Sequence, residues 1–390
     1  MNVKGILKDV GGASRVTKKR SESFNNASDK PIYNNPVGDT AKQLHSGLIE
    51  LELVEIREAS KSSKTLKFKA KNLPYFIAGQ ALTLILNIDG SRVTRAYSIS
   101  SAPYETLLKD PFVEITVRKP KVNGFVGDYL YDKAKLGDKY LSEVGLGEFN
   151  YDSIRDSKNI VAIAGGSGIT PFVSMAKEIK HSNFDINLTI IYGSVFEDDI
   201  VLKNELDSLE CEKVKVVHVL SGDNPSWSGE KGYITSEIIK KYSKGDTTYF
   251  VCGPQAMYDF VKGEFEKLNI ERRRIRFELA GSAKDVTKEK EYPIELKDKI
   301  FKMTVCQGIS ETVIDAKSCE PIAVALERAG LKIHTACRSG FCGFCRVKVL
   351  EGTYYVSLPY DGRRFMDKEF GYVHSCSTYP TSDIKIKLNI

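Results

Sequence analysis

Cys337-Arg338-Ser339-Gly340-Phe341-Cys342-Gly343-Phe344-Cys345 is the most informative stretch of this chain, and Cys376 follows it 31 positions later. The spacing is Cys-x4-Cys-x2-Cys-x30-Cys, whereas the other four cysteines are scattered. Three cysteines on one loop and a fourth far along the chain can surround a small inorganic centre from two sides. Gly340 and Gly343 allow the loop backbone to come close and to direct its N–H groups at sulfur.

This spacing is that of the cysteine ligands of a plant-type 2Fe-2S cluster. Structural zinc is the alternative for four thiolates, but zinc sites usually combine two Cys-x2-Cys pairs, and this region has one. The sequence therefore predicts a 2Fe-2S cluster with the ligands Cys337, Cys342, Cys345 and Cys376. Such a cluster accepts one electron at a time, so another group has to receive a hydride.

Working outward, the hydrophobic pattern divides the chain into three folded parts and two connecting segments. Residues 47–156 contain short β-rich runs and predict an antiparallel barrel. Strands and helices alternate over 157–281, which predicts a parallel sheet covered on both faces. Residues 282–293 are charged and predict a linker, and residues 294–390 contain a hairpin, a helix and the cysteine cluster. The expected strands are 51–56, 65–68, 81–88, 96–99, 113–117, 160–164, 188–192, 214–220, 248–251, 275–279, 300–305 and 311–314, and the expected helices are 171–179, 201–209, 236–242, 255–268 and 321–329.

Composition narrows the class of protein. Hydrophobic residues make up 42% and charged residues 28%, as in soluble folded proteins. No apolar run is long enough to span a membrane and no secretory signal is recognisable, so a cytoplasmic protein is expected. The net charge of +6 forms no dense basic stripe, so no nucleic-acid partner is expected. Residues 1–46 show no sustained periodicity and predict a flexible arm.

Two segments of the barrel region have the chemistry to bind a flavin nucleotide. In Arg95-Ala96-Tyr97-Ser98, an arginine can grip a pyrophosphate, a tyrosine can stack on a flat ring, and a serine can hydrogen-bond the ring edge. The segment Gly124-Phe125-Val126-Gly127 is a turn that opens into a short helix, which suits a phosphate group.

A third segment suits a dinucleotide. Gly165-Gly166-Ser167-Gly168-Ile169-Thr170-Pro171 lies directly between an expected strand and an expected helix. Backbone N–H groups at this edge of a parallel sheet can meet a nucleotide. The segment does not fit Gly-x-Gly-x-x-Gly, so no true Rossmann fingerprint is present.

With these motifs in this order, residues 47–390 resemble a ferredoxin-NADP reductase superfamily oxidoreductase fused to a C-terminal plant-type ferredoxin. The domain order is similar to that of the phthalate dioxygenase reductase group and of reductases that serve phenylacetyl-CoA epoxidase, hybrid-cluster protein and desaturases. The resemblance implies a multidomain fold of an antiparallel β-barrel flavin domain, an α/β nucleotide domain and an α+β β-grasp ferredoxin domain. It also implies an NAD(P)H-dependent reductase that contains FAD, or alternatively FMN.

The resemblance assigns roles to particular residues. Arg95, Ala96, Tyr97 and Ser98 would hold the flavin, with Val117 and the turn formed by Gly124, Phe125, Val126 and Gly127. Gly165, Gly166, Gly168, Thr170 and Pro171 would line the nicotinamide side, followed by the Tyr192-Gly193-Ser194 segment and by Cys252-Gly253-Pro254, which would cap the hydride-transfer site. Ser98 and Cys252 are the expected catalytic residues.

The chain also departs from the family pattern. Gly127 stands where many relatives have serine in the phosphate turn, and the segment from Gly145 to Phe149 lacks the usual proline. The common Glu-x-Phe-Gly is here Glu278-Leu279-Ala280-Gly281, without the aromatic residue that often covers the flavin. Glu278 is therefore not counted among the flavin neighbours.

The choice of pyridine nucleotide follows from Val195-Phe196-Glu197-Asp198-Asp199, which comes after Tyr192-Gly193-Ser194. Three carboxylates would repel a 2'-phosphate, and Asp199 can accept hydrogen bonds from a ribose. NADH is expected, with NADPH as the alternative if Lys203 binds the phosphate.

Together these features predict that electrons pass from NADH through FAD and the 2Fe-2S cluster to a separate acceptor protein. An oxygenase, a hybrid-cluster protein, a desaturase or another reductase could be that acceptor. Two alternatives remain open: an electron-transfer subunit of a permanent dehydrogenase complex, and a redox-sensing module.

Overall fold

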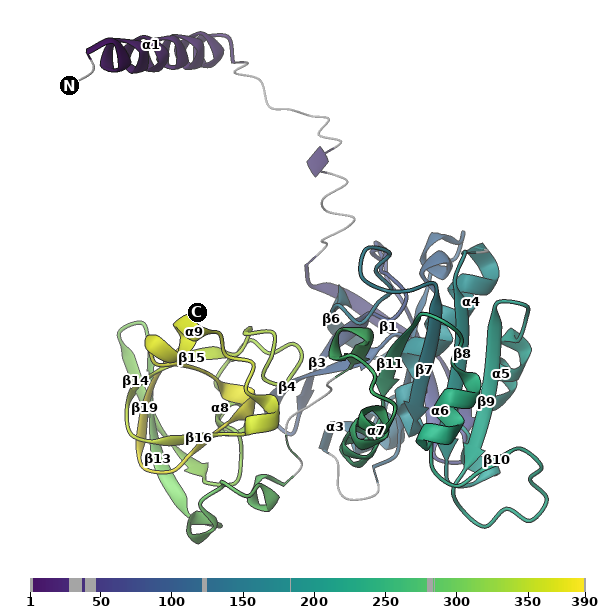
Figure 1. Ribbon diagram of the computed structural model, residues 1–390. Coiled ribbons are helices and arrows are strands. Elements are labelled where there is room, and N and C mark those ends of the chain that lie inside the picture. Colours follow the sequence, from purple (N-terminus) through teal and green to yellow (C-terminus); the bar gives the residue numbers. More distant parts are fainter. Residues whose placement is uncertain are drawn as a thin grey trace. The chain divides into compact units, whose positions relative to one another are not determined.

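The computed structural model describes residues 3–27, 37–38, 47–120, 125–182, 184–278, 283 and 285–388. The chain divides into two compact units, residues 1–42 and 43–390. The first contains helix α1 (Val3–Asn25), drawn in purple in Figure 1. The sequence analysis predicted no helix at residues 3–25, and the flexible arm stays a prediction. All side chains from residue 13 to residue 25 are exposed, so this part of the helix buries no apolar stripe that periodicity could reveal.

The flavin-domain barrel is a six-stranded antiparallel sheet with the strand order β4-β3-β6-β1-β2-β5. An isolated antiparallel bridge between Ile99 and Ile115 joins its two edges and closes the barrel. Alternate side chains point inward, among them Leu82, Leu84 and Leu86, which are almost completely buried. The strands are β1 (Ile49–Ser60), β2 (Ser63–Lys69), β3 (Ala81–Ile88), β4 (Ser91–Ser98), β5 (Val113–Arg118) and β6 (Lys139–Leu146), and α3 (Phe125–Asp128) follows β5. β6 was not predicted.

The nucleotide domain is a six-stranded parallel sheet in the order β10-β9-β8-β7-β11-β12. One core packs α4 and α5 against one face, and a second core packs α6 and α7 against the other, as the alternation of elements predicted. The elements are β7 (Asn159–Gly165), α4 (Thr170–Ser182), β8 (Asn187–Ser194), α5 (Lys203–Leu209), β9 (Val214–Leu220), β10 (Glu230–Lys231), α6 (Ser236–Tyr242), β11 (Thr247–Cys252), α7 (Gln255–Lys267) and β12 (Ile275–Phe277).

The C-terminal domain is a mixed five-stranded sheet in the order β14-β13-β19-β15-β17, with α8 packed on it and a small β16-β18 ladder beside it. This α+β arrangement agrees with the predicted ferredoxin domain. Its elements are β13 (Ile300–Gln307), β14 (Ser310–Lys317), α8 (Ile322–Arg328), β15 (Arg346–Glu351), β16 (Tyr354–Val356), α9 (Phe365–Glu369), β17 (Tyr372–His374), β18 (Thr378–Pro380) and β19 (Ile384–Leu388).

The segment predicted as a linker packs against the C-terminal domain. Val286 and Tyr292 are buried in a small apolar cluster with Tyr379. The carboxylate of Glu289 accepts hydrogen bonds from the Tyr355 hydroxyl (2.9 Å) and from the Ser357 hydroxyl (2.5 Å). The later part of the linker is therefore fixed to the domain that it precedes.

In the described part of the chain, no helix combines the length and the apolar character that crossing a membrane requires.

Candidate functional site

The four predicted cluster ligands lie together as two pairs of thiols. The Cys342 N–H donates to the sulfur of Cys337 (3.4 Å), and Cys345 and Cys376 lie in one buried cluster. Among the described residues, no three side chains of histidine, cysteine, aspartate or glutamate are placed to hold a single metal ion. Two thiols on each of two irons is the ligand set of a 2Fe-2S cluster, whereas one zinc ion needs four ligands around one point. The paired arrangement therefore fits the ligand set of a 2Fe-2S cluster.

Backbone geometry brings the loop close to the sulfurs. Gly340 has a φ of 79°, and a Cβ at this position would lie 1.8 Å from the carbonyl oxygen of Tyr360, so no other residue fits. The Gly340 N–H donates to the sulfur of Cys376 (3.2 Å), and the N–H groups of Ser339 and Cys342 each donate to the sulfur of Cys337 (3.4 Å). Such N–H donors stabilise negative charge on sulfur.

One thiol of each pair is biased toward the thiolate. Hydrogen bonds from the Cys342 thiol and from the Ser339 backbone lower the pKa of Cys337 well below its ordinary value. The thiol of Cys376 likewise lowers the pKa of Cys345. Each pair therefore holds one thiolate readily, while interaction within the pair and burial raise the pKa of its other thiol, Cys342 or Cys376.

The expected flavin strand is β4, which carries the segment from Arg95 to Ser98. The Arg95 guanidinium donates to the carbonyl of Thr94 (2.9 Å) and lies 3.9 Å from the carboxylate of Glu327. Burial, together with the nearby Arg338, lowers the pKa of Arg95 to about 10. A desolvated cation beside another cation is a suitable partner for a pyrophosphate, so this strand fits the predicted flavin nucleotide.

Ser98 meets two residues of the nucleotide domain. Its hydroxyl donates to both carboxylate oxygens of Glu278 (3.0 and 3.2 Å), and the thiol of Cys252 donates to one of them (2.9 Å). Burial raises the pKa of Glu278, and burial together with Glu278 raises the pKa of Cys252. Folding thus brings Glu278, which was not counted among the flavin neighbours, to the two predicted catalytic residues. Ala280, of the same segment, lies outside the described residues.

The glycine segment after β7 packs directly on the Cys252 segment. A Cβ on Gly168 would lie 2.2 Å from the Cys252 carbonyl oxygen, and one on Gly165 would lie 3.1 Å from a ring carbon of Pro254. A side chain on Gly253 would likewise meet the backbone nitrogen of Gly165 at 3.3 Å. These close approaches bring the two predicted nucleotide segments together. Thr170 and Pro171 follow as the buried start of α4.

Arg118, at the end of β5, was missed by the sequence analysis. A Cβ on Gly166 would lie 2.8 Å from a guanidinium nitrogen of Arg118, so this cation lies against the glycine segment. Its Nε donates to the Ser62 hydroxyl (3.1 Å), and another nitrogen donates to Asp199. A cation at this position fits a dinucleotide phosphate.

Asp199 has contacts that the sequence analysis did not foresee. Its carboxylate accepts hydrogen bonds from the hydroxyls of Ser60 (3.0 Å) and Ser62 (2.6 Å) and from Arg118. These three donors belong to the barrel, so Asp199 joins the nucleotide domain to the flavin domain, and its contact with a ribose stays a prediction. The alternative phosphate ligand Lys203 pairs with Asp207 (2.9 Å).

Several other predicted binding residues have side chains that pack within their own domain, and their binding roles stay predictions. Val117 and Val126 are buried in the barrel core, and Tyr192 is fully buried in the nucleotide domain. The Tyr192 hydroxyl donates to the carbonyl of Gly166 (2.8 Å) and so braces the glycine segment. Gly124 lies outside the described residues, and Gly127 packs against the ring of Pro120.

The remaining members of these segments lie at the ends of their elements. Phe125 is half exposed at the start of α3. A Cβ on Gly193 would meet Ile234 at 3.3 Å, and the carbonyl of Ser194 accepts a hydrogen bond from Ser221 (3.0 Å). β8 therefore ends in a position set by its neighbours in the same domain.

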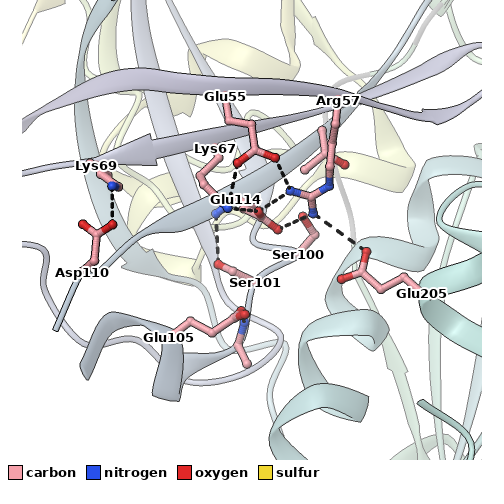
Figure 2. Close-up of polar contacts among 12 residues, drawn as sticks. Glu55, Arg57, Lys67, Lys69, Ser100, Ser101, Glu105, Asp110, Glu114 and Glu205 are labelled. Carbon is pink, nitrogen blue, oxygen red and sulfur yellow. Dashed lines mark hydrogen bonds and ion pairs between the residues drawn. The ribbon is translucent and has the colours of Figure 1, made fainter. Parts of the chain in front are cut away.

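A buried charge network holds the barrel against the nucleotide domain. Figure 2 shows the carboxylate of Glu114 on β5 accepting two hydrogen bonds from the guanidinium of Arg57 (2.5 and 2.8 Å). Lys177 of α4 lies 4.0 Å from Glu114 and 2.5 Å from Glu205 of α5. Since the carboxylate of Glu114 is only 3% exposed, both domains depend on these ion pairs to balance its charge.

The ferredoxin domain touches the other two domains through its cluster loop and the residues beside it. Arg338 donates to the carbonyl of Thr94 on β4 (3.1 Å) and forms a double hydrogen bond with Glu327 (2.6 and 2.8 Å). The Tyr360 hydroxyl donates to the side chain of Gln255 (2.8 Å), directly after the Cys252 segment. The cluster loop is thus tied to both segments that would hold the other two cofactors.

Comparison with known proteins agrees with this division. Residues 50–151 match the family described as oxidoreductase FAD-binding domain, residues 162–263 the oxidoreductase NAD-binding domain, and residues 307–381 the 2Fe-2S iron-sulfur cluster binding domain. Over 372 residues the chain is 26% identical to the glycine betaine monooxygenase reductase subunit of Chromohalobacter salexigens, which covers 90% of this chain and 98% of that protein.

Two further relatives support the assignment. The chain is 30% identical over 236 residues to NADH-cytochrome b5 reductase 1 of Candida glabrata, which covers 58% of this chain and 81% of that protein. The solved structure of phthalate dioxygenase reductase shares the fold with a TM-score of 0.64 and 21% identity, over 88% of this chain and 98% of that chain. The chain belongs to the ferredoxin-NADP reductase superfamily of FAD- and NAD-binding oxidoreductases, in the group that carries a C-terminal 2Fe-2S ferredoxin domain.

Proposed function

We propose that this reductase passes electrons from NADH to a separate oxygenase. The proposal rests on the contacts of β4 with both the nucleotide domain and the cluster loop. The strand that would hold the flavin meets Cys252 and Glu278 of the nucleotide domain through Ser98, and it meets Arg338 of the cluster loop through Thr94. The input and the output of a relay would therefore adjoin the same strand. The oxygenase acceptor is suggested by the names of the relatives, a monooxygenase reductase subunit and a dioxygenase reductase.

A bound flavin supplies the conversion between a two-electron donor and a one-electron acceptor. The chain supplies the orientation and the proton path. The Ser98 hydroxyl would lie at the edge of the ring. When the ring is reoxidised, Ser98 would accept a proton from it while its own hydroxyl proton passes to the carboxylate of Glu278, over 3.0 Å. Cys252 remains a protonated thiol, because its pKa is raised, and it fills the space beside Glu278 without forming a covalent bond.

The charges beside β8 favour NADH over NADPH. Glu197 and Asp198 are exposed, and Asp199 and Lys203 are occupied by partners within the chain. A 2'-phosphate would meet these exposed carboxylates without a free arginine or lysine among residues 195–203 to offset them.

Reduced thiols and an NADH supply are both found in the cytoplasm, which is the location we propose.

The test is an anaerobic stopped-flow reaction of the holoprotein with NADH. Loss of the flavin absorbance should be followed by the spectroscopic signal of a reduced 2Fe-2S cluster, and a purified oxygenase should then reoxidise that cluster. A Cys345→Ser variant, which lacks one ligand, is the control for flavin reduction without cluster reduction. If the flavin of the parent is reduced while the cluster stays oxidised, the relay is refuted. If the cluster is reduced but no oxygenase accepts its electrons, only the choice of acceptor is refuted.

A further inference from the structure

We propose that the acceptor protein docks on an apolar patch with a basic rim that surrounds Cys342. This inference rests on the proposed function, because it names the surface through which the relay delivers its electrons. The patch consists of Phe341 and Phe344 on the cluster loop and of Phe365, Met366 and Phe370 at α9 and its end, and we call it the cluster-loop patch.

The cluster-loop patch lies where the cluster is most accessible. Of the four ligands, Cys342 is the exposed one, whereas Cys345 and Cys376 are buried. Phe341 and Phe344 on either side of Cys342 are 47% and 56% exposed. An electron acceptor has to approach the cluster closely, and this is the side from which a ligand sulfur can be reached.

α9 extends the same surface. Phe365 is 72% exposed, Met366 57% and Phe370 56%. Gly362, just before α9, packs so closely that a Cβ there would lie 2.7 Å from the Cα of Phe341. Five large exposed apolar side chains in two adjoining segments exceed what isolated surface residues explain, and they are typical of a protein interface.

The charges around the patch select the kind of partner. Of the three acids in residues 361–370, Asp361 and Asp367 are largely covered and pair with neighbouring basic residues, whereas Glu369 is exposed. Arg346 and Lys368 are each 50% exposed, and Arg364 is also exposed, so three exposed cations stand against one exposed carboxylate. The buried acids hold Arg346 and Lys368 in place while the rim presents positive charge to solvent. An acceptor with an apolar centre and an acidic rim fits this surface.

The test uses two haem proteins of opposite charge, acidic cytochrome b5 and basic cytochrome c, as acceptors for the NADH-reduced holoprotein. Reduction that persists in the cluster-free Cys345→Ser variant is subtracted, because it comes directly from the flavin. At low ionic strength, we expect a lower KM for cytochrome b5 than for cytochrome c, and we expect added salt to raise it. Preference for cytochrome c would overturn the charge assignment.

The apolar part is tested with Phe365→Ser combined with Phe370→Ser, which leaves the cluster loop unchanged. The KM for cytochrome b5 should rise about tenfold, as for the loss of interface anchors, while NADH-ferricyanide activity and cluster reduction by NADH stay at the parent level. Ile309→Ser is the matched control, since Ile309 is fully exposed at the β13–β14 turn of the same domain, and β14 and β17 lie at opposite edges of the sheet.

Two results would overturn the docking proposal. One is an unchanged KM for cytochrome b5 in the double variant. The other is a parent protein that elutes as a dimer and a double variant that elutes as a monomer, because a second copy of the chain would then cover the patch. Failure of NADH to reduce the cluster in the parent would instead refute the proposed function, and it is detected before any acceptor is added.

Discussion

Cys252 and Glu278 can position the hydride donor without forming a covalent bond to it. Cys252 is buried, and its thiol donates to Glu278 at 2.9 Å. Cys252→Ala removes this donor but leaves the backbone carbonyl, against which Gly168 packs, in place. We expect flavin reduction by NADH to slow by about tenfold or more, with unchanged flavin and iron content. Cys211→Ala, at an exposed thiol of the same domain, should change nothing. An unaltered rate in Cys252→Ala would rule out this role.

Glu278 should give electron transfer from the reduced flavin to the cluster an acid limb. Burial raises its pKa, so the carboxyl group remains protonated to a higher pH than an ordinary glutamate. A protonated Glu278 cannot accept the proton of Ser98, and the rate should therefore fall as the pH decreases through this raised pKa. Glu278→Gln should be slower and should lose the limb. The measurement is the pH profile of cluster reduction by the reduced flavin in a single turnover, and an identical acid limb in the variant would contradict the assignment.

Among the elements, the contact of β5 with α4 and α5 sets how the barrel meets the nucleotide domain. Glu114→Gln leaves Arg57 and Lys177 without their buried partner, which should cost about 3 kcal/mol of stability. The first thermal unfolding transition should move to a lower temperature, and the KM for NADH should rise. Asp110→Asn is the control, because Asp110 is 76% exposed in its pair with Lys69, which Figure 2 also shows. Equal melting temperatures would argue against a network that joins the domains.

The hydrogen bond from Tyr360 to α7 should help to seat the ferredoxin domain for electron transfer. Tyr360→Phe removes one hydroxyl and keeps the ring, so we expect cluster reduction by NADH to slow about fivefold while ferricyanide reduction is unchanged. Tyr355→Phe is matched, because its hydroxyl bonds to Glu289 of the linker and not to the nucleotide domain. If the clusters of both variants are reduced at the parent rate, the Tyr360 hydrogen bond does not contribute to electron transfer.

For the whole molecule, residues 43–390 form a compact unit that contains all three cofactor domains. Deletion of residues 1–42 should therefore leave NADH-ferricyanide activity, cluster reduction and melting temperature unchanged. These three measurements on the shortened holoprotein are the check. A loss of any of them would mean that the first unit contributes to the catalytic part of the chain.

Much of this architecture is readable without coordinates, because the relevant information is local. The spacing of Cys337, Cys342 and Cys345 is set by one loop that must reach a small cluster, and the alternation of strands and helices follows from which faces are buried. The domain order was therefore predicted correctly, and the ligand set stays a prediction that the cysteine spacing supports. The exposed helix α1 was not predicted, because a helix that buries few side chains has no periodic pattern of apolar residues.

Contacts between distant residues required the folded chain. Ser98 and Glu278 are 180 positions apart, and Arg338 and Thr94 are 244 positions apart. No periodicity links such positions, because the pairing depends on how three independently patterned domains pack. For the same reason, Asp199 could be recognised as a carboxylate near a nucleotide, while only the packing of the barrel decides that its oxygens accept hydrogen bonds from Ser60, Ser62 and Arg118.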